Sequence, residues 1–464
     1  MIFVKVINLP LIENYFYFSE MQNDKVHLER RLGLLQATAI NMIDMVGIGP
    51  FVVLPIVIQL MYGPWFIYAW IAGALLSLVD SLIWSELGAA LPNAGGSFYF
   101  LRTAYGEKSW GKLMSFLYTW QTMIQAPLVI ASGAIGFSMY AGYLVELNDI
   151  TSRMVSGGVV ILLTALLYRN ISTIGKMSTL LWVGVVGTIL WIIWGGLQNG
   201  HLFEPIKAMN DGLHVNALFG VALGAASVKT IYSYLGYYNV CHLGSEIKDP
   251  AKIIPRSMLL SVIGIAILYL LMNMSVVSVI PWQEASESKF IVSLFLEKLY
   301  GTTAATIGTV LILWIAFASL FAVMLGYSRV PYAAAKEGEF FEVFSKLHPT
   351  KHFPHVALIG LGITAFFFSL LFKLTEVITA ILAMRILVQF IGQAIGLMMM
   401  RKNKTIAFPF KMPLYPLPII IAIIMWLAIF ISTGITFMYS GLIVIITGII
   451  AYLIKAKKND EWPF

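Results

Sequence analysis

The feature that most limits what this chain can fold into is its series of long apolar blocks. A run of about 18 or more apolar residues with few charges can cross a bilayer as a helix. Residues 66–84 (FIYAWIAGALLSLVDSLIW) and 418–439 (PIIIAIIMWLAIFISTGITFMY) are two of many such runs. Only 11% of the 464 residues are charged, against about 25% in soluble domains. The sequence therefore predicts an all-α polytopic membrane protein.

Polar loops separate the apolar blocks into twelve predicted spans. They cover residues 34–60, 64–90, 112–145, 153–169, 177–199, 216–243, 257–280, 302–328, 355–372, 376–400, 416–436 and 438–455. Because this number is even, both termini are expected on one side of the membrane. Of the 30 Lys and Arg residues, 23 lie in the tails and loops of that side, whereas the opposite loops hold only Arg153, Lys207, Lys289, Lys298 and Lys373. Since positively charged loops stay in the cytoplasm, we expect a multi-pass protein of the cell membrane with both termini cytoplasmic.

Several common features are absent from the sequence. The single cysteine, Cys241, excludes an intramolecular disulfide and a cysteine metal cluster. The histidines show no ligand spacing with acidic residues deep in a span, so we expect no metal site. The N-terminal residues carry no secretory signal pattern, and Met21 is a second candidate start beside Met1. The net charge of +7 comes from the loops, and it is interpreted as membrane topology rather than as nucleic-acid binding.

The first span contains helix breakers at its centre. The stretch NMIDMVGIGPFVVLP places Gly47, Gly49 and Pro50 within four positions. Proline removes an amide donor, and glycine loosens a helix. In hydrocarbon the freed backbone groups need partners, so such a break survives only where it is buried in protein or lines a cavity. The alternative is that the small residues only allow another helix to approach closely.

The sixth span contains a second candidate break. Its sequence, KTIYSYLGYYNVCHLGSEI, has Gly236 and Gly244 among polar aromatic residues. Interrupted helices at matching positions of two halves point to the binding site of a transporter. Two five-span repeats would have inverted topologies, because an odd number of crossings separates their starts. The predicted segments are a tail (1–33), a first repeat (34–200), a second repeat (201–400), a loop with two further helices (401–455) and a second tail (456–464).

Broken helices favour a particular class of ligand. A half-helix N-terminus offers unpaired amides and partial positive charge, which suit a carboxylate. A half-helix C-terminus offers unpaired carbonyls, which suit an ammonium group. A zwitterionic amino acid requires both, so the pattern predicts this class of ligand without specifying its side chain.

At this point the residues resemble a known group, the amino acid–polyamine–organocation transporter superfamily. GIGP in the first span resembles the unwound segment of that family, and ELGAALPNAGGSFYFLRTAYG resembles its first cytoplasmic loop. GSEIKDPAKIIPRS, SRVPYAAAKEGEF and PFKMPLYPLP complete five similar motifs in order. The resemblance implies a leucine-transporter-type fold, which is an inverted five-plus-five repeat with discontinuous first and sixth helices, followed by two more helices.

The resemblance also implies a substrate site at the two breaks. Carried over by position, its residues are Met45, Val46, Gly47, Ile48, Gly49, Tyr232, Tyr234, Leu235 and Gly236. The segment from Gly47 to Gly49 would meet the substrate carboxylate. The carbonyl groups of Met45, Tyr232 and Leu235 would receive the amine, and the two tyrosines are candidates for side-chain contact and gating.

Two departures from the family pattern matter. Many members have serine between the two glycines, whereas this chain has Ile48, so only backbone donors remain there. Some members hold a lysine in the fifth span where sodium-coupled relatives bind a cation, and this chain has none there. Ser319 offers a single hydroxyl where sodium-coupled relatives use two. Coupling to protons or to exchange is therefore favoured over coupling to sodium.

Asp44, Asp80, Lys229 and Arg385 lie well inside predicted spans, where charge is costly and usually functional or paired. Asp44, one helical turn before the first break, would receive a substrate amine, carry a proton, or form an ion pair with Lys229 or Arg385. Lys229 would alternate between charged and neutral forms or stay in a static ion pair. Arg385 cannot plausibly deprotonate, so it would attract an anion or stabilise the fold. Asp80 is expected to pair with a loop cation.

The function that these observations favour is secondary transport of amino acids by alternating access. No nucleotide-binding motif and no catalytic constellation occur at helical spacing in the spans, so an enzyme is a weak alternative and no cofactor is expected. A channel would predict pore-lining polar stripes rather than two broken helices. Ile48, Tyr232, Tyr234 and Leu235 favour neutral amino acids, whereas Asp44 keeps cationic amino acids or polyamines as an alternative. The expected partners are an amino acid, the bilayer and protons, with no obligate protein partner.

Overall fold

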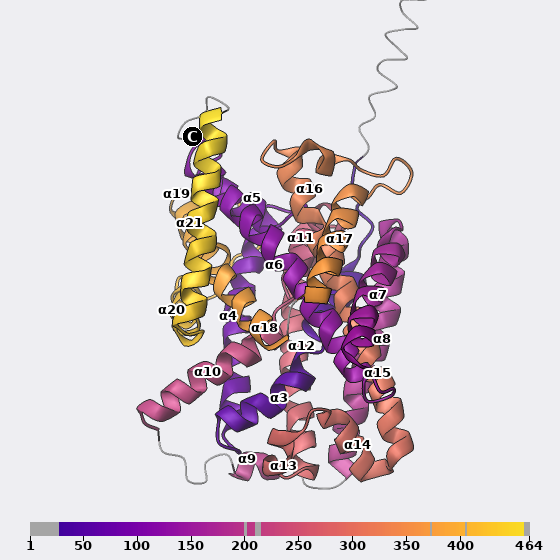
Figure 1. Ribbon diagram of the computed structural model, residues 1–464. Helices are drawn as coiled ribbons and strands as arrows, with labels where there is room; N and C mark the ends of the chain where they lie inside the picture. Colours follow the sequence, from indigo (N-terminus) through magenta and orange to yellow (C-terminus); the bar gives the residue numbers. More distant parts are fainter. Residues whose placement is uncertain (1–26, 199–201, 209–214, 372–373, 404–405, 459–464) are drawn as a thin grey trace, which may run out of the picture.

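The structure is a computed structural model that describes residues 27–198, 202–208, 215–371, 374–403 and 406–458. The candidate starts Met1 and Met21, Lys373, and most of both predicted tails lie outside the described residues. In the described part of the chain every regular element is a helix (Figure 1). The all-α class predicted from the sequence is therefore confirmed.

The helices follow one another in the order of the predicted spans. They are α2 (Leu34–Met45), α3 (Gly49–Leu60), α4 (Phe66–Ala90), α5 (Ser97–Ala104), α6 (Trp110–Ala141), α7 (Asp149–Leu167), α8 (Ile171–Gln198), α9 (Glu204–Ala208), α10 (Ala217–Tyr234), α11 (Asn239–His242), η1 (Gly244–Glu246), α12 (Pro250–Val279), α13 (Trp282–Glu287), α14 (Ile291–Tyr300), α15 (Thr302–Tyr327), α16 (Arg329–Lys336), η2 (Glu342–Ser345), α17 (His355–Leu371), α18 (Leu374–Arg385), η3 (Ile386–Gly392), α19 (Gln393–Asn403), α20 (Leu417–Ser432) and α21 (Ile435–Lys458).

In the described ranges, eight continuous helical stretches are long and apolar enough to cross a membrane. Residues 302–336, which join α15 and α16, and residues 378–403, which run from α18 to α19, each count as one of them. The number is nine when α2 and α3 are taken as one bent pair. Two further apolar helices, α17 and α20, are shorter. The protein is therefore polytopic, and the count of twelve spans stays a prediction. The sequence did not predict the short helices α5, α14 and α16, which lie between the spans.

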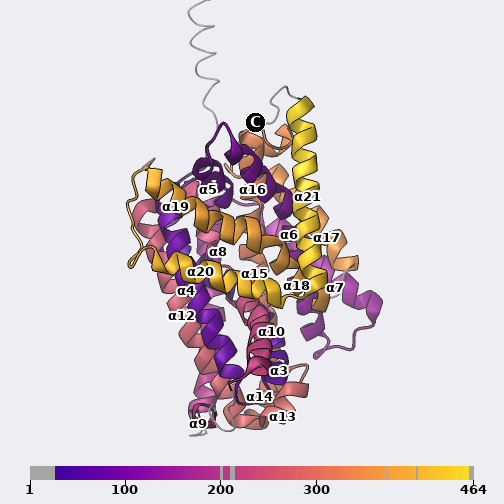
Figure 2. The ribbon, with the colours of Figure 1, turned by 90° about the vertical axis from the view of Figure 1, so that its left-hand side faces the viewer.

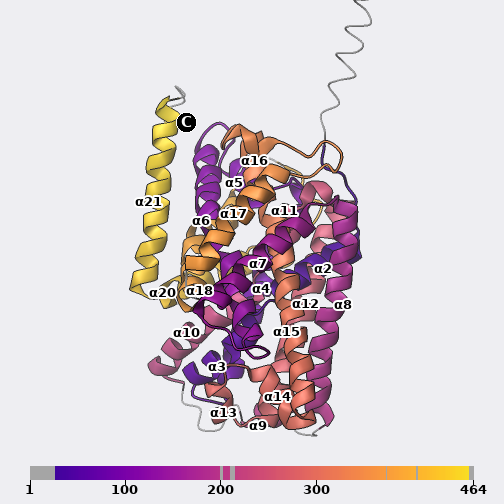
Figure 3. The same ribbon diagram turned by 45° about the vertical axis from the view of Figure 1, so that its right-hand side comes forward.

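The bundle has two distinct ends. The short helices α5 and α16 and the C-terminal end of α21 lie at one end, which we call the α5 end (Figures 1 and 3). Helices α9, α13 and α14 lie at the opposite end. Figure 2 shows α19 and α20 crossing one side of the bundle. Only 17% of the most apolar stretch of the last helix, α21, is buried against the rest of the protein, so this helix lies at the periphery.

The first predicted break is present. Helix α2 ends at Met45 and α3 begins at Gly49, with a bend of 43° between them. Pro50 occupies the first turn of α3, where its missing amide costs no intrahelical hydrogen bond. The breakers in the sequence therefore end one half-helix and begin the next.

The second predicted break is also present. Helix α10 ends at Tyr234, Leu235 is extended, and Gly236 adopts a φ angle of 120°. The short helix α11 follows from Asn239. A third irregularity was not predicted: residues 386–392 form a π-helical segment between α18 and α19. Such segments occur frequently at functional sites.

Candidate binding cavity at the two helix breaks

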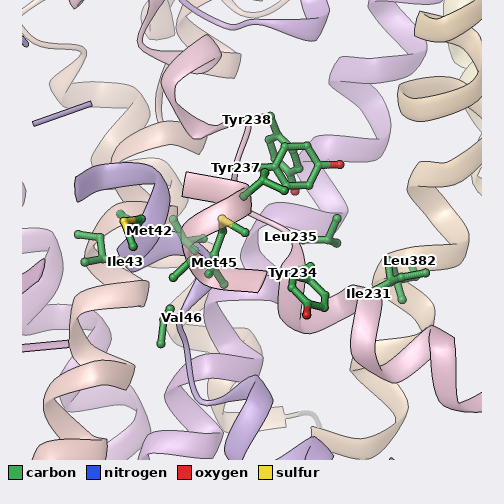
Figure 4. Packing of buried hydrophobic residues seen from close by; sticks show 14 of the residues in the cluster. Met42, Ile43, Met45, Val46, Ile231, Tyr234, Leu235, Tyr237, Tyr238 and Leu382 are labelled. Carbon is green, nitrogen blue, oxygen red and sulfur yellow. The ribbon is translucent and has the colours of Figure 1, made fainter. Parts of the chain in front are cut away.

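A cavity of about 60 Å³ lies between the two interrupted spans. It is lined by Asp44, Met45, Gly47, Ile48, Gly49, Val129, Gly133, Tyr232, Ser233, Leu235, Gly236, Tyr238, Ala316, Ser319, Leu320, Val323, Tyr327, Ile381 and Arg385. Figure 4 shows the two breaks beside each other, with Met45 on one and Leu235 on the other. Nine of the twelve residues proposed from the sequence therefore lie around one space.

The N-terminus of α3 presents unpaired amides to this cavity. The first intrahelical hydrogen bond of α3 runs from the amide of Val52 to the carbonyl of Ile48 at 3.2 Å. The amides of Ile48 and Gly49 come earlier, and neither donates to an acceptor in the part of the chain that is described. Both residues line the cavity. These amides, together with the positive end of the helix dipole, can bind a carboxylate.

The carbonyl groups at the other half-helix ends differ in availability. The carbonyl of Met45 already accepts the hydroxyl of Tyr269 at 2.7 Å and the amide of Gly47 at 3.2 Å. The carbonyl of Tyr232, in the last turn of α10, accepts no hydrogen bond from the described residues. Of these two carbonyls, that of Tyr232 is therefore the one free to receive an ammonium group.

Glycine is needed where the two breaks meet. A Cβ atom on Gly236 would lie 2.7 Å from the backbone nitrogen of Met45 and 2.9 Å from the carboxyl carbon of Asp44. A Cβ atom on Gly47 would lie 2.7 Å from the hydroxyl oxygen of Ser319 on α15. The Ser319 hydroxyl in turn donates to the carbonyl of Asp44 at 3.3 Å. The breaks are thus held in direct contact with each other and with α15.

Asp44 is stabilised by an amide rather than by a cation. The side-chain nitrogen of Asn239 donates to its carboxylate at 2.8 Å and to the carbonyl of Ala322 at 2.7 Å. The ion pair with Lys229 or Arg385 that the sequence suggested is not formed between these described residues. A neutral donor can satisfy a carboxylate without a second buried charge, which explains why no cation is needed there.

Arg385 lies at the junction of α18 with the π-helical segment and is 2% exposed. Its guanidinium donates to the side-chain oxygen of Gln389 at 2.8 Å and to the hydroxyl of Tyr238. It also lies over the rings of Tyr238 and Phe390, 5.0 and 5.2 Å from their centroids. No described carboxylate forms an ion pair with it, and the π-helical segment brings Gln389 and Phe390 to the same group.

Lys229 and Asp80 lie away from the cavity lining. The ammonium of Lys229 donates to the hydroxyl of Thr379 at 2.9 Å. The carboxylate of Asp80 accepts the hydroxyl of Tyr237 at 2.5 Å and the indole N–H of Trp426 at 3.0 Å. The expected pairing of Asp80 with a loop cation is therefore wrong, because two neutral donors from distant spans satisfy both of its oxygens.

Two other proposed site residues do not line the cavity. Tyr234 is fully buried and packs edge-on against Trp70 and Tyr269, with ring centroids 5.9 and 5.2 Å away. Val46 is also fully buried, in the hydrophobic core. Tyr232 does line the cavity, and its hydroxyl lies 3.0 Å from that of Ser132 on α6.

Sequence reasoning missed several residues of the lining. Tyr238 and Tyr327 form its polar wall beside Arg385, and Val129, Leu320 and Ile381 form an apolar wall. Tyr238 was within reach of a prediction, because it lies two residues after the glycine of the second break. The apolar residues of α6, α15 and α18 gave no signal, because nothing distinguishes them from lipid-facing residues in the sequence.

Comparison with known proteins adds independent information. A family model described as amino acid permease matches residues 32–454. The serine/threonine exchanger SteT of Bacillus subtilis (strain 168) is 26% identical over 413 residues, which cover 87% of this chain and 91% of the relative. The branched-chain amino acid permease BcaP of the same organism is 24% identical, with 94% of each chain covered. The human cystine/glutamate transporter is 25% identical, with 95% and 88% covered.

The contact between the breaks leads to a first prediction. Gly236→Ala should lower the free energy of unfolding by about 2 kcal/mol or more, because it combines an unfavourable φ angle with a backbone clash. Gly220→Ala, in the same helix α10, is the matched control, since a Cβ atom there meets nothing within 4 Å. Thermal unfolding of the two purified variants measures the difference. Equal melting temperatures would show that the breaks are not packed as described.

Proposed function

This chain belongs to the amino acid permease family, and we propose that it carries small neutral amino acids across the cell membrane by alternating access. The observation that carries this proposal is the pair of complementary groups at the breaks. The unpaired amides of Ile48 and Gly49 suit the substrate carboxylate, and the free carbonyl of Tyr232 suits its amine. Both belong to one cavity, so a zwitterion can satisfy them together.

The size of the cavity supports a small substrate. Its volume is about 60 Å³, and a water molecule needs roughly 10–15 Å³ on this measure. The space therefore suits the zwitterionic backbone and a short side chain. Val129, Leu320 and Ile381 offer that side chain an apolar wall. Two relatives are described by name as carriers of neutral amino acids, a serine/threonine exchanger and a branched-chain amino acid permease.

The main alternative is a cationic amino acid, since a relative 23% identical to this chain is a human cationic amino acid transporter. Asp44 lines the cavity and could meet a second positive charge. However, Arg385 lines the same cavity with a permanent positive charge. The opposed charges of Asp44 and Arg385 favour a ligand without net charge.

Coupling is proposed to involve protons or exchange, with Lys229 linking protonation to gating. Its ammonium lies on α10 within two turns of the second break, and it donates a hydrogen bond to the neutral hydroxyl of Thr379. Loss of a proton from Lys229 would therefore leave no carboxylate unpaired. The resemblance of the chain to an exchanger supports the second mode. The proposal includes no cofactor and no obligate protein partner.

Reconstitution tests the proposed function directly. Purified protein in proteoliposomes should exchange external radiolabelled alanine or serine for internal alanine at least about tenfold faster than phenylalanine or lysine. Gly47→Leu should abolish this counterflow, because its side chain enters the carboxylate site and meets Ser319. Gly187→Leu is the control, since a Cβ atom at this exposed position meets nothing within 4 Å. Fastest exchange with lysine would establish the cationic alternative, and no exchange with any amino acid would reject the proposal.

The coupling role of Lys229 predicts a change in pH dependence. Lys229→Ala should flatten the dependence of net uptake on pH and should spare counterflow, because only net transport requires the proton to be carried. Lys229→Arg should slow net uptake, because the charge can no longer be lost. Lys298→Ala, an exposed lysine paired with Glu284, is the control. A strict sodium requirement, or an unchanged pH profile in Lys229→Ala, would contradict the role.

The proposed orientation places the α5 end in the cytoplasm. Because Cys241 is buried, single added cysteines can be labelled in an otherwise native chain. Cysteines at Glu287 and Lys289 should react with an impermeant maleimide added outside intact cells, whereas cysteines at Lys252 and Lys346 should react only after the membrane is opened. The reverse pattern would invert the orientation.

A further inference from the structure

A second cavity, of about 220 Å³, lies at the α5 end, apart from the cavity at the breaks. Five separate segments build it: the chain before α2, the α4–α5 loop, helix α5, the turn after α11, and helix α16. None of its lining residues also lines the cavity at the breaks. The proposed amino acid site therefore does not account for this second cavity.

The lining of this cavity is positively charged. Its charged or titratable side chains include those of His27, Arg30 and Lys336, and the described lining contains no carboxylate. The neighbouring acidic groups pair with cations outside the lining: Glu29 lies 2.8 Å from the guanidinium of Arg31, and Glu337 lies 3.9 Å from that of Arg102. The positive charge of the cavity is therefore not neutralised by its own walls.

The neutral polar groups of the lining also have donors to spare. The hydroxyl oxygen of Ser245 accepts the amide of Ala94 at 2.9 Å, which leaves its proton free to donate. Tyr332 is only 7% exposed, yet it lines the cavity, and its hydroxyl makes no hydrogen bond within the described ranges. Because this residue lines the cavity, a ligand there can accept a hydrogen bond from its hydroxyl.

We infer that this cavity binds a phosphate-type anion. Three basic side chains and at least two spare hydroxyl donors match the several acceptor oxygens of such a group. The volume exceeds what an inorganic phosphate fills, so the anion would be part of a larger molecule. Two sources share this chemistry: a soluble phosphate ester in the cytoplasm and the headgroup of an anionic lipid at the membrane surface.

Such an anion would hold the α5 end closed. The amides of Arg31 and Leu32 donate to the carbonyl of Glu246 at 2.9 and 3.0 Å, and the carboxylate of Glu246 binds Arg329 in a buried bidentate ion pair at 2.8 and 2.9 Å. These contacts join the same segments that line the cavity. Opening of this end requires those segments to separate, so an anion that bridges them slows opening. This consequence, unlike the binding itself, rests on the proposed transport function.

Binding is tested with the full-length protein in detergent and with pyrophosphate as the probe. Calorimetric titration at ionic strength matched with potassium chloride should show saturable binding. The double variant Arg30→Gln/Lys336→Gln should weaken it at least about tenfold, because charge-assisted hydrogen bonds are lost. Tyr332→Phe should weaken it without changing net charge. The control is Lys176→Gln/Lys346→Gln, which removes the same charge from two exposed lysines outside the lining.

A second measurement distinguishes the source of the anion. If the ligand is a lipid headgroup, the protein should bind vesicles of phosphatidylcholine with phosphatidylglycerol more tightly than vesicles of phosphatidylcholine alone, and the lining variant should abolish the difference. The inference is overturned if neither pyrophosphate nor the anionic vesicles bind above the salt control, or if the control variant weakens binding equally. If the anion binds but counterflow stays unchanged, the anion does not hold the α5 end closed. If the protein shows no counterflow even when no anion is added, the proposed transport function is rejected instead.

Discussion

The rest of this structure depends on how two interrupted backbones are satisfied inside a membrane protein. A single side chain contributes to both. The hydroxyl of Tyr269, on α12, lies 2.7 Å from the carbonyl of Met45 at the first break and 3.2 Å from that of Ser233 at the second. Gly236 allows the two segments to touch, and Asn239 ties the second break to Asp44. Because unsatisfied backbone groups cost several kcal/mol in hydrocarbon, these contacts allow both helices to stay broken.

The breaks could be predicted from the sequence because their cause is local. Gly47, Pro50 and Gly236 disfavour a continuous helix through their own backbone properties, so the pattern indicated where each half-helix ends. Helix geometry could also have predicted that Tyr232 and Tyr234 face different surroundings. Residues two positions apart are separated by about 200° around a helix, so Tyr232 and Tyr234 cannot both face one cavity. The structure places Tyr232 in the lining and Tyr234 in the core.

The partners of the intramembrane charges could not be predicted, because they come from distant spans and are mostly neutral. Asp44 finds Asn239, and Asp80 finds Tyr237 together with Trp426. A charged residue in an apolar span stands out in the sequence because burying a charge is unfavourable. The usual expectation is then an ion pair with a residue of opposite charge. An amide, hydroxyl or indole N–H satisfies a carboxylate equally well in geometry, and such groups are too common in the chain to stand out. Which of these neutral donors binds each carboxylate is decided by how the helices pack.

Both cavities contain hydrogen-bond donors that have no acceptor within the described residues. Glu246, a fully buried acid at the α5 end, forms an ion pair with Arg329, whereas the amides of Ile48 and Gly49 and the hydroxyl of Tyr332 have no partner among the described residues. An unmade hydrogen bond costs about 1–3 kcal/mol for a buried group. Other buried donors, such as the indole nitrogen of Trp70, also lack a partner among the described residues, but Trp70 lines neither cavity. Only the donors that line a cavity can be reached by a ligand. The unpaired donors at both places therefore argue for acceptors supplied from outside the chain: a carboxylate at the breaks and a phosphate-type anion at the α5 end.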